Sequence, residues 1–153
     1  MISKSPRAIV RLFVLASLFV LATVGIFAAD GDPDASFAGT GKTTTFLNGY
    51  ALGTTVVVQP DGKTLVAGTV GDANADSIFG VARYNVDGTL DNTFGTNGWA
   101  TVDFYNYYLW SVEVVVQNDG KIVLAGAAAT APFGAQPDMG LARLNADGSL
   151  DAT

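Results

Sequence analysis

Short apolar runs, separated by Gly, Asp and Asn, follow one another along the chain after residue 30. The runs are rich in Val, Thr, Ile and aromatic residues, which favour β-strands, and none keeps a 3.6-residue period. The expected strands are, in order, Lys42–Leu47, Leu52–Gln59, Lys63–Val70, Phe79–Asn85, Trp99–Tyr105, Trp110–Gln117, Lys121–Ala127 and Met139–Asn145. The pattern therefore predicts an all-β fold of short antiparallel strands.

Two of the gaps between these strands have the composition of a tight turn. Asp61–Gly62 and Asp119–Gly120 each lie between two apolar runs. Asp-Gly readily adopts the positive φ that a tight turn needs, so the strands on either side are predicted to form hairpins. Within the hairpins, Val56–Val58 and Val114–Val116 are continuous apolar runs, which is typical of strands covered on both faces.

The first 29 residues have a different pattern, that of a targeting segment. An apolar run over Leu12–Ala29 follows three basic residues, and this order predicts a helical signal peptide over residues 1–29. The run is close to the shortest that crosses a bilayer, so a retained membrane anchor is the alternative. In both cases the rest of the chain is expected to be exported, either secreted or held at the cell surface.

Several phrases occur twice in the same order, so the chain contains an internal repeat. Three pairs of segments match at displacements of 58, 60 and 57 residues: Val57–Lys63 and Val115–Lys121, Gly80–Asp91 and Gly140–Asp151, and Asp34–Phe37 and Asp91–Phe94. We expect two copies of one strand-rich unit, over residues 30–92 and 93–153, the second belonging to an incomplete array.

The charge and the missing residue types exclude several classes of function. After Ala29 there are five basic residues and all 14 acidic ones, a net charge of −9 that repels nucleic acid and anionic lipid. The chain has no cysteine and no histidine, so disulfides, thiol chemistry, Ser–His catalysis and Cys- or His-ligated metals are excluded. A two-carboxylate hydrolase remains open, although no spacing singles out a pair and Glu113 is the lone Glu.

Three loops contain closely spaced oxygen ligands of the kind that Ca²⁺ prefers. They are Asn85–Asp91, its counterpart Asn145–Asp151, and Asp72–Asp76. For the first two we favour turns whose Asp and Asn side chains cap their own backbone, because the distal bidentate Glu of a calcium loop is lacking. The third is interpreted as a solvated loop.

Two further features have a functional and a structural interpretation. Arg83 and Arg143 occupy equivalent strand positions and could bind an acidic ligand, but pairing with a turn carboxylate such as Asp87 or Asp91 is favoured. The aromatic stretch Phe104–Trp110 could stack on sugars or anchor a protein, and packing between sheets is favoured over such a binding surface.

The phrase Gln59–Lys63, followed by Leu65–Gly68 and then by Ala82–Gly95, closely resembles the delta-60 repeat family of bacterial repeats of uncharacterised role. The resemblance covers about Asp32–Thr153. It implies propeller-like blades, each a sheet of about four antiparallel strands, in an exported and often surface-associated protein. It implies no catalytic residues.

We therefore expect a non-enzymatic exported repeat protein with a structural or binding role at or outside the cell surface. The alternative is a fragment of a propeller glycosidase or polysaccharide lyase. No catalytic, cofactor-binding or metal-binding residue is assigned, and the expected partner is a protein or a carbohydrate, with a membrane contacted only through an uncleaved residue 1–29 segment. Because a propeller contains ~4–8 blades, a homo-oligomer or further repeats are expected to complete the ring.

Overall fold

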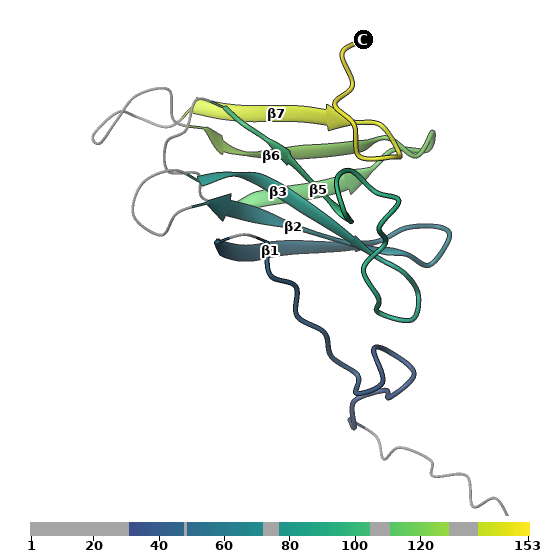
Figure 1. Cartoon of the computed structure of the whole chain (residues 1–153). Coiled ribbons are helices and arrows are strands. Elements are labelled where there is room, and N and C mark those ends of the chain that lie inside the picture. The colour runs from purple at the N-terminus through teal and green to yellow at the C-terminus, as the bar shows by residue number, and fades with distance from the viewer. Residues whose placement is uncertain (1–30, 48, 72–76, 105–110, 129–137) are drawn as a thin grey trace, which may run out of the picture.

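The protein forms two antiparallel β-sheets that lie against each other (Figure 1). The computed structural model describes residues 31–47, 49–71, 77–104, 111–128 and 138–153. The first sheet has the order β1 (Tyr50–Val58), β2 (Thr64–Gly71), β3 (Ser77–Tyr84) and β4 (Trp99–Val102). The second has the order β5 (Val112–Val116), β6 (Ile122–Ala128) and β7 (Asp138–Leu144). The all-β prediction is confirmed for these residues.

The two predicted hairpins are confirmed, and their turns have the same geometry. β1 pairs antiparallel with β2, and β5 with β6. In the first turn the Gly62 amide donates to the Gln59 carbonyl at 2.9 Å, and in the second Gly120 donates to Gln117 at 2.9 Å. Both glycines have a φ of 83°. The positive φ therefore falls on the glycine of each Asp-Gly pair, as in a three-residue hairpin loop.

One expected strand is wrong, because no strand forms over residues 42–47. Its counterpart in the second copy, β4, does form, but it pairs with β3 and so completes the sheet of the first copy. A segment at this point of the repeat therefore needs the free edge of the preceding sheet. In the described part of the chain, residues 42–47 have no such edge beside them.

The core lies between the two sheets, and each sheet contributes one face to it. We call the face of the first sheet that carries Leu65, Ala67, Phe79 and Val81 its forward face, and the opposite side its rear face. The second sheet contributes its rear face, through Val112, Val114, Ile122, Leu124, Ala142 and Leu144. All ten side chains are buried in one cluster. Burial of such apolar surface stabilises a fold by ~25 cal/mol for each Å² removed from water.

Phe79 shows how closely the two sheets approach. Its ring lies over two glycines of the second sheet, where an added Cβ at Gly126 would lie 2.9 Å, and one at Gly140 3.4 Å, from Phe79 Cζ. Thr54 Oγ1 accepts from the Val112 amide at 3.0 Å, which links β1 to β5. The glycines at these two positions thus leave room for a large side chain of the neighbouring sheet.

Several predictions lie outside the described residues. They are the signal peptide or anchor over residues 1–29, the loop Asp72–Asp76 and most of the aromatic stretch Phe104–Trp110. Within the described ranges, no helix has the length and apolarity needed to cross a bilayer.

Candidate functional site

The two candidate calcium loops, Asn85–Asp91 and Asn145–Asp151, form equivalent backbone turns. In the first, Asp87 Oδ1 accepts hydrogen bonds from the amide and the hydroxyl of Thr89 at 3.0 and 2.6 Å. In the second, Asp147 Oδ1 accepts from the amide and the hydroxyl of Ser149 at 2.9 and 2.6 Å. These hydrogen bonds lower the pKa of both carboxyl groups. The side chains cap their own turns, as predicted.

The predicted pairing of Arg83 with a turn carboxylate is confirmed, and the partner is Asp91. Arg83 Nε and Lys63 Nζ both donate to Asp91 Oδ2, at 2.7 and 2.8 Å. Burial by itself would raise the pKa of Asp91, but the hydrogen bonds from Lys63, Thr93 and Arg83 together lower it well below its usual range. We call Lys63, Arg83 and Asp91 the Arg83 cluster. Asp91 engages both cations inside the protein, which favours the structural interpretation of Arg83 over binding of an acidic ligand.

The second copy contains the same cluster, formed by Lys121, Arg143 and Asp151. Lys121 Nζ and Arg143 Nε donate to Asp151 Oδ2 at 2.8 and 2.5 Å. The hydrogen bonds from Lys121, Thr153 and Arg143 lower the pKa of Asp151. The two clusters differ in their surroundings, because the Arg143 side chain is 39% exposed and that of Arg83 only 10%.

Arg83 also contacts the turn that follows β7. Its Nη1 donates to the Ala146 carbonyl at 2.6 Å, and its guanidinium lies 4.6 Å from the centre of the Phe94 ring. Phe94 in turn packs against Gly148, and the neighbouring Gly95 amide donates to the Asp147 carbonyl at 2.7 Å. The Arg83 cluster therefore joins the two copies.

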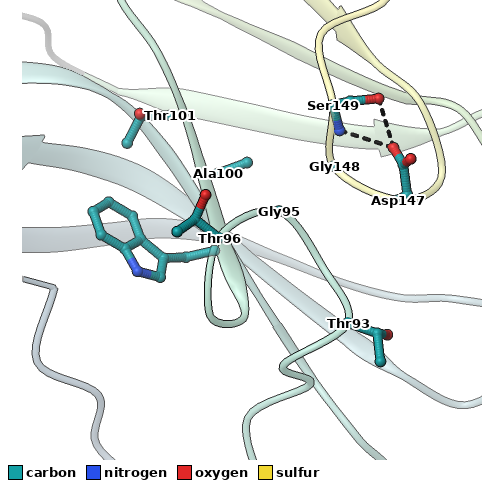
Figure 2. A pocket seen from close by; sticks show the side chains of 9 residues that line it. Thr93, Gly95, Thr96, Ala100, Thr101, Asp147, Gly148 and Ser149 are labelled. Atoms are coloured by element: carbon teal, nitrogen blue, oxygen red, sulfur yellow. Dashed lines mark hydrogen bonds between the residues drawn. The ribbon is translucent and has the colours of Figure 1, made fainter.

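A pocket of about 440 Å³ opens at this junction (Figure 2). Trp99 and the hydroxyls of Thr93, Thr96 and Thr101 line one side, and the turn with Asp147 and Ser149 lines the other. An indole beside hydroxyls and a carboxylate can hold a polar ligand such as a sugar. Among the described residues that line the pocket, Asp147 is the acidic one, whereas a glycosidase uses a pair of carboxylates.

The forward face of the second sheet is apolar and exposed. On it, Met139 is 98% and Leu141 69% exposed, and the exposed Val115 lies on the same side. Their counterparts 60 residues earlier, Phe79 and Val81, are both 0% exposed because the second sheet covers them. Equivalent positions are thus buried in one sheet and open in the other, which marks this face as a candidate interaction surface. Glu113 of β5 is exposed beside these positions.

The aromatic residues near the sheet interface divide between core and surface. Phe104, the described member of the stretch Phe104–Trp110, packs against Phe79 with ring centres 4.9 Å apart. For this residue, packing against the core is confirmed. Phe46, in the first copy, is 81% exposed, while its neighbour Leu47 lines a small pocket on the rear face of the first sheet.

Neither the exposed forward face nor the pocket at the junction follows from the sequence. Alternation in β7 could have placed Met139 and Leu141 on one side of a sheet, but not shown that this side is uncovered. The pocket joins Trp99 of β4 to Asp147 in the turn after β7, so their proximity has no signal in the sequence.

Comparison with known families gives one match. Residues 59–94 and 117–153 match the sequence profile of a family described as "Domain of unknown function (DUF5122) beta-propeller". The two matched segments correspond to the two copies of the repeat, which supports a β-propeller-like, all-β repeat domain. The delta-60 resemblance is consistent with this family and stays a prediction. No curated protein and no solved structure matches the chain.

Proposed function

We propose that this is a non-enzymatic, exported repeat protein with a structural or binding role at or outside the cell surface, and that it acts through the forward face of the second sheet. The observation that supports this proposal is the exposure of Met139 and Leu141 at positions whose counterparts in the first sheet are fully buried. Burying one such side chain stabilises a complex by about 1.5–3 kcal/mol. A face of this kind gains free energy when a partner covers it.

Two further features support the proposal. Export is supported by the basic and then apolar order of residues 1–29. The net charge of −9 after Ala29 disfavours nucleic acid and anionic lipid as partners and leaves proteins as the class that fits an apolar β-sheet face.

Peroxide footprinting on intact cells tests whether the face is covered. Met139 is the only methionine apart from Met1, so its oxidation is read directly as a mass increase. We expect Met139 in cells to oxidise at least several-fold more slowly than in the chain unfolded in guanidinium, and Leu141→Glu, which puts a charge on the face, to remove this protection. Equal rates in cells and in guanidinium would contradict the binding role.

Export is tested separately. A reporter enzyme that is active only outside the cytoplasm, fused after Thr153, should be active with the full chain and inactive when residues 12–29 are deleted. Activity in both fusions, or in neither, would contradict export directed by this segment.

A further inference from the structure

We propose that the forward face of the second sheet binds the rear face of the first sheet of a second copy of this chain, and that residues 42–45 of that copy add to β7 as a fourth strand. This inference rests on the proposed function and names its partner. The molecules would then associate head to tail, and the contact between two molecules would resemble the contact between the two sheets within one molecule.

The internal contact shows that the two faces fit each other. It joins a forward face to a rear face, and among the described residues the forward face of the second sheet and the β1 side of the rear face of the first sheet are left open. The rear face of the first sheet carries the exposed Val56 and Val58, the counterparts of Val114 and Val116 in the second sheet. A second molecule therefore offers a surface equivalent to the one that the forward face of the first sheet contacts within the chain.

The rear face of the first sheet also holds a cavity for Met139. In the internal contact, Phe79 lies over Gly126 and Gly140. The counterparts of these glycines, Gly68 and Gly80, line a cavity of about 150 Å³, and the counterpart of Phe79 is the almost fully exposed Met139. A flexible methionine fills an irregular apolar hole well. The side chain and the cavity lie on opposite outer faces of the two packed sheets, so a second molecule is needed to bring them together.

Residues 42–45 lie at the border of this cavity. They form no strand, because no free strand edge lies beside them among the described residues. Thr45 lines the cavity, and the Tyr84 hydroxyl donates to Thr45 Oγ1 at 2.8 Å, which holds the segment on the rear face. The outer edge of β7 has no neighbouring strand among the described residues, whereas β3 has β4. Placing residues 42–45 on β7 would supply what each of the two segments lacks.

The repeat also predicts the register of the new strand pair. In the first sheet, Val81 pairs with Ala100, and Phe79 with Val102. Displacements of 60 residues for β7 and 57 for the added segment give Leu141 opposite Thr43 and Met139 opposite Thr45. One further contact follows from Arg83, whose Nη1 donates to the Ala146 carbonyl: the half-exposed Arg143 would reach the carbonyl of Val86 in the second copy.

The contact between two molecules would differ from the contact between the two sheets of one molecule in the position of one Asp. Asp151 already pairs with Lys121 and Arg143. Asp34 of the second molecule, the counterpart of Asp91, therefore cannot take the same position beside Arg143. Asp34 is exposed and accepts a hydrogen bond from the Ser36 amide at 2.9 Å. The residues before Phe37 therefore turn away from the contact, and the association relies on the sheet faces and the added strand.

Disulfide trapping tests the register in cells, because the natural chain has no cysteine. Two full-length chains with different tags are co-expressed, one carrying Thr43→Cys and the other Leu141→Cys. Cα atoms of directly opposed strand residues lie about 4.5–5.5 Å apart, within the range that a disulfide spans. We expect a disulfide-linked product that contains both tags. The matched control is Thr44→Cys with Leu141→Cys, in which the two side chains point to opposite faces of the added strand, and it should link at least ten-fold less.

The outcomes separate this inference from the proposed function. Absence of the linked product from Thr43→Cys with Leu141→Cys, while Met139 stays protected from peroxide, would mean that another partner covers the face. That result overturns the inference and leaves the binding role standing. Equal linking by the Thr44→Cys control would indicate random encounter and would also overturn it. If Met139 is unprotected as well, both proposals fail.

Discussion

At the scale of single residues, the repeated Asp that follows β3 and β7 forms an ion cluster within the fold. Asp91 accepts hydrogen bonds from Lys63 and Arg83 while it is almost fully buried. A buried carboxylate is tolerated only when cations and hydrogen bonds compensate for its lost hydration. The same three residue types recur in the second copy, which shows that the repeat preserves the whole cluster and not the Asp alone.

Replacing Asp91 by Asn should destabilise the protein markedly. The substitution leaves the buried Arg83 without its counter-charge, and breaking a buried ion pair on one side costs about 3–5 kcal/mol. Guanidinium unfolding followed by tryptophan fluorescence measures the loss. Asp151→Asn is the matched control: it should cost less, because Arg143 is more exposed and water can solvate it. Equal losses in the two variants would contradict the structural difference between the clusters.

The stability of the protein should also depend on acid in a defined direction. The folded-state pKa of Asp91 lies below its ordinary value of 3.8, so ionised Asp91 stabilises the fold above that pH. This stabilisation is lost as the pH falls below 3.8 towards the folded-state pKa. Unfolding midpoints measured between pH 6 and pH 2 should drop less steeply in Asp91→Asn than in the natural chain. An unchanged slope would show that Asp91 does not control acid stability.

At the scale of elements, the hairpin turns depend on glycines at which the backbone has a positive φ. Gly120 has a φ of 83°, and an added Cβ there would meet Ala146 Cβ only at an ordinary contact distance of 3.6 Å. The backbone conformation, and not crowding, therefore requires glycine. This separates the turn glycines from Gly126 and Gly140, whose importance lies in the side chain that packs over them.

Gly120→Ala should therefore cost about 1–2 kcal/mol, the usual strain of an L-residue in the left-handed region. Gly120→Asn should cost less, because Asn adopts this region more readily. Thermal unfolding of the two variants measures the difference. If Ala and Asn were equally well tolerated as Gly, the turn geometry described for Gln117–Lys121 would be wrong.

At the scale of the whole molecule, the two equivalent positions 79 and 139 have opposite environments. Phe79 is buried between the sheets and Met139 is almost fully exposed. The same point of the repeat thus serves stability in one copy and, in our proposal, association in the other.

This contrast predicts that two matched truncations affect different properties, one the stability of the fold and the other the association of molecules. Phe79→Ala should lower the free energy of unfolding by about 3–5 kcal/mol because it leaves a cavity in the core. Met139→Ala should leave the unfolding of the isolated chain within about 0.5 kcal/mol of the natural value, as at other exposed sites, and weaken the association of copies. Denaturant unfolding at low protein concentration and light scattering at high concentration measure the two effects. Loss of folding in Met139→Ala would contradict the exposed placement of this side chain.

The charge of the molecule adds one more prediction at this scale. Each chain carries a net charge of −9 after Ala29, so two molecules repel each other electrostatically, while contact between their apolar faces is favourable. Because salt screens repulsion between exposed charges, association should strengthen between about 0.01 and 0.5 M NaCl. Light scattering measures the association. If association weakened over this salt range, ion pairs and not apolar contacts would hold the molecules together.

The sequence by itself determined the all-β class, the repeat, the hairpins at Asp61–Gly62 and Asp119–Gly120, and the pairing of Arg83 with a nearby Asp. These follow from local composition and from phrases that recur at a constant distance. Only the tertiary structure decided that Trp99–Val102 belongs to the first sheet, that residues 42–47 form no strand, and which sheet faces are covered. Those properties depend on which free edge and which apolar face lie next to a segment, and alternation of apolar residues along one strand carries no information about its neighbours.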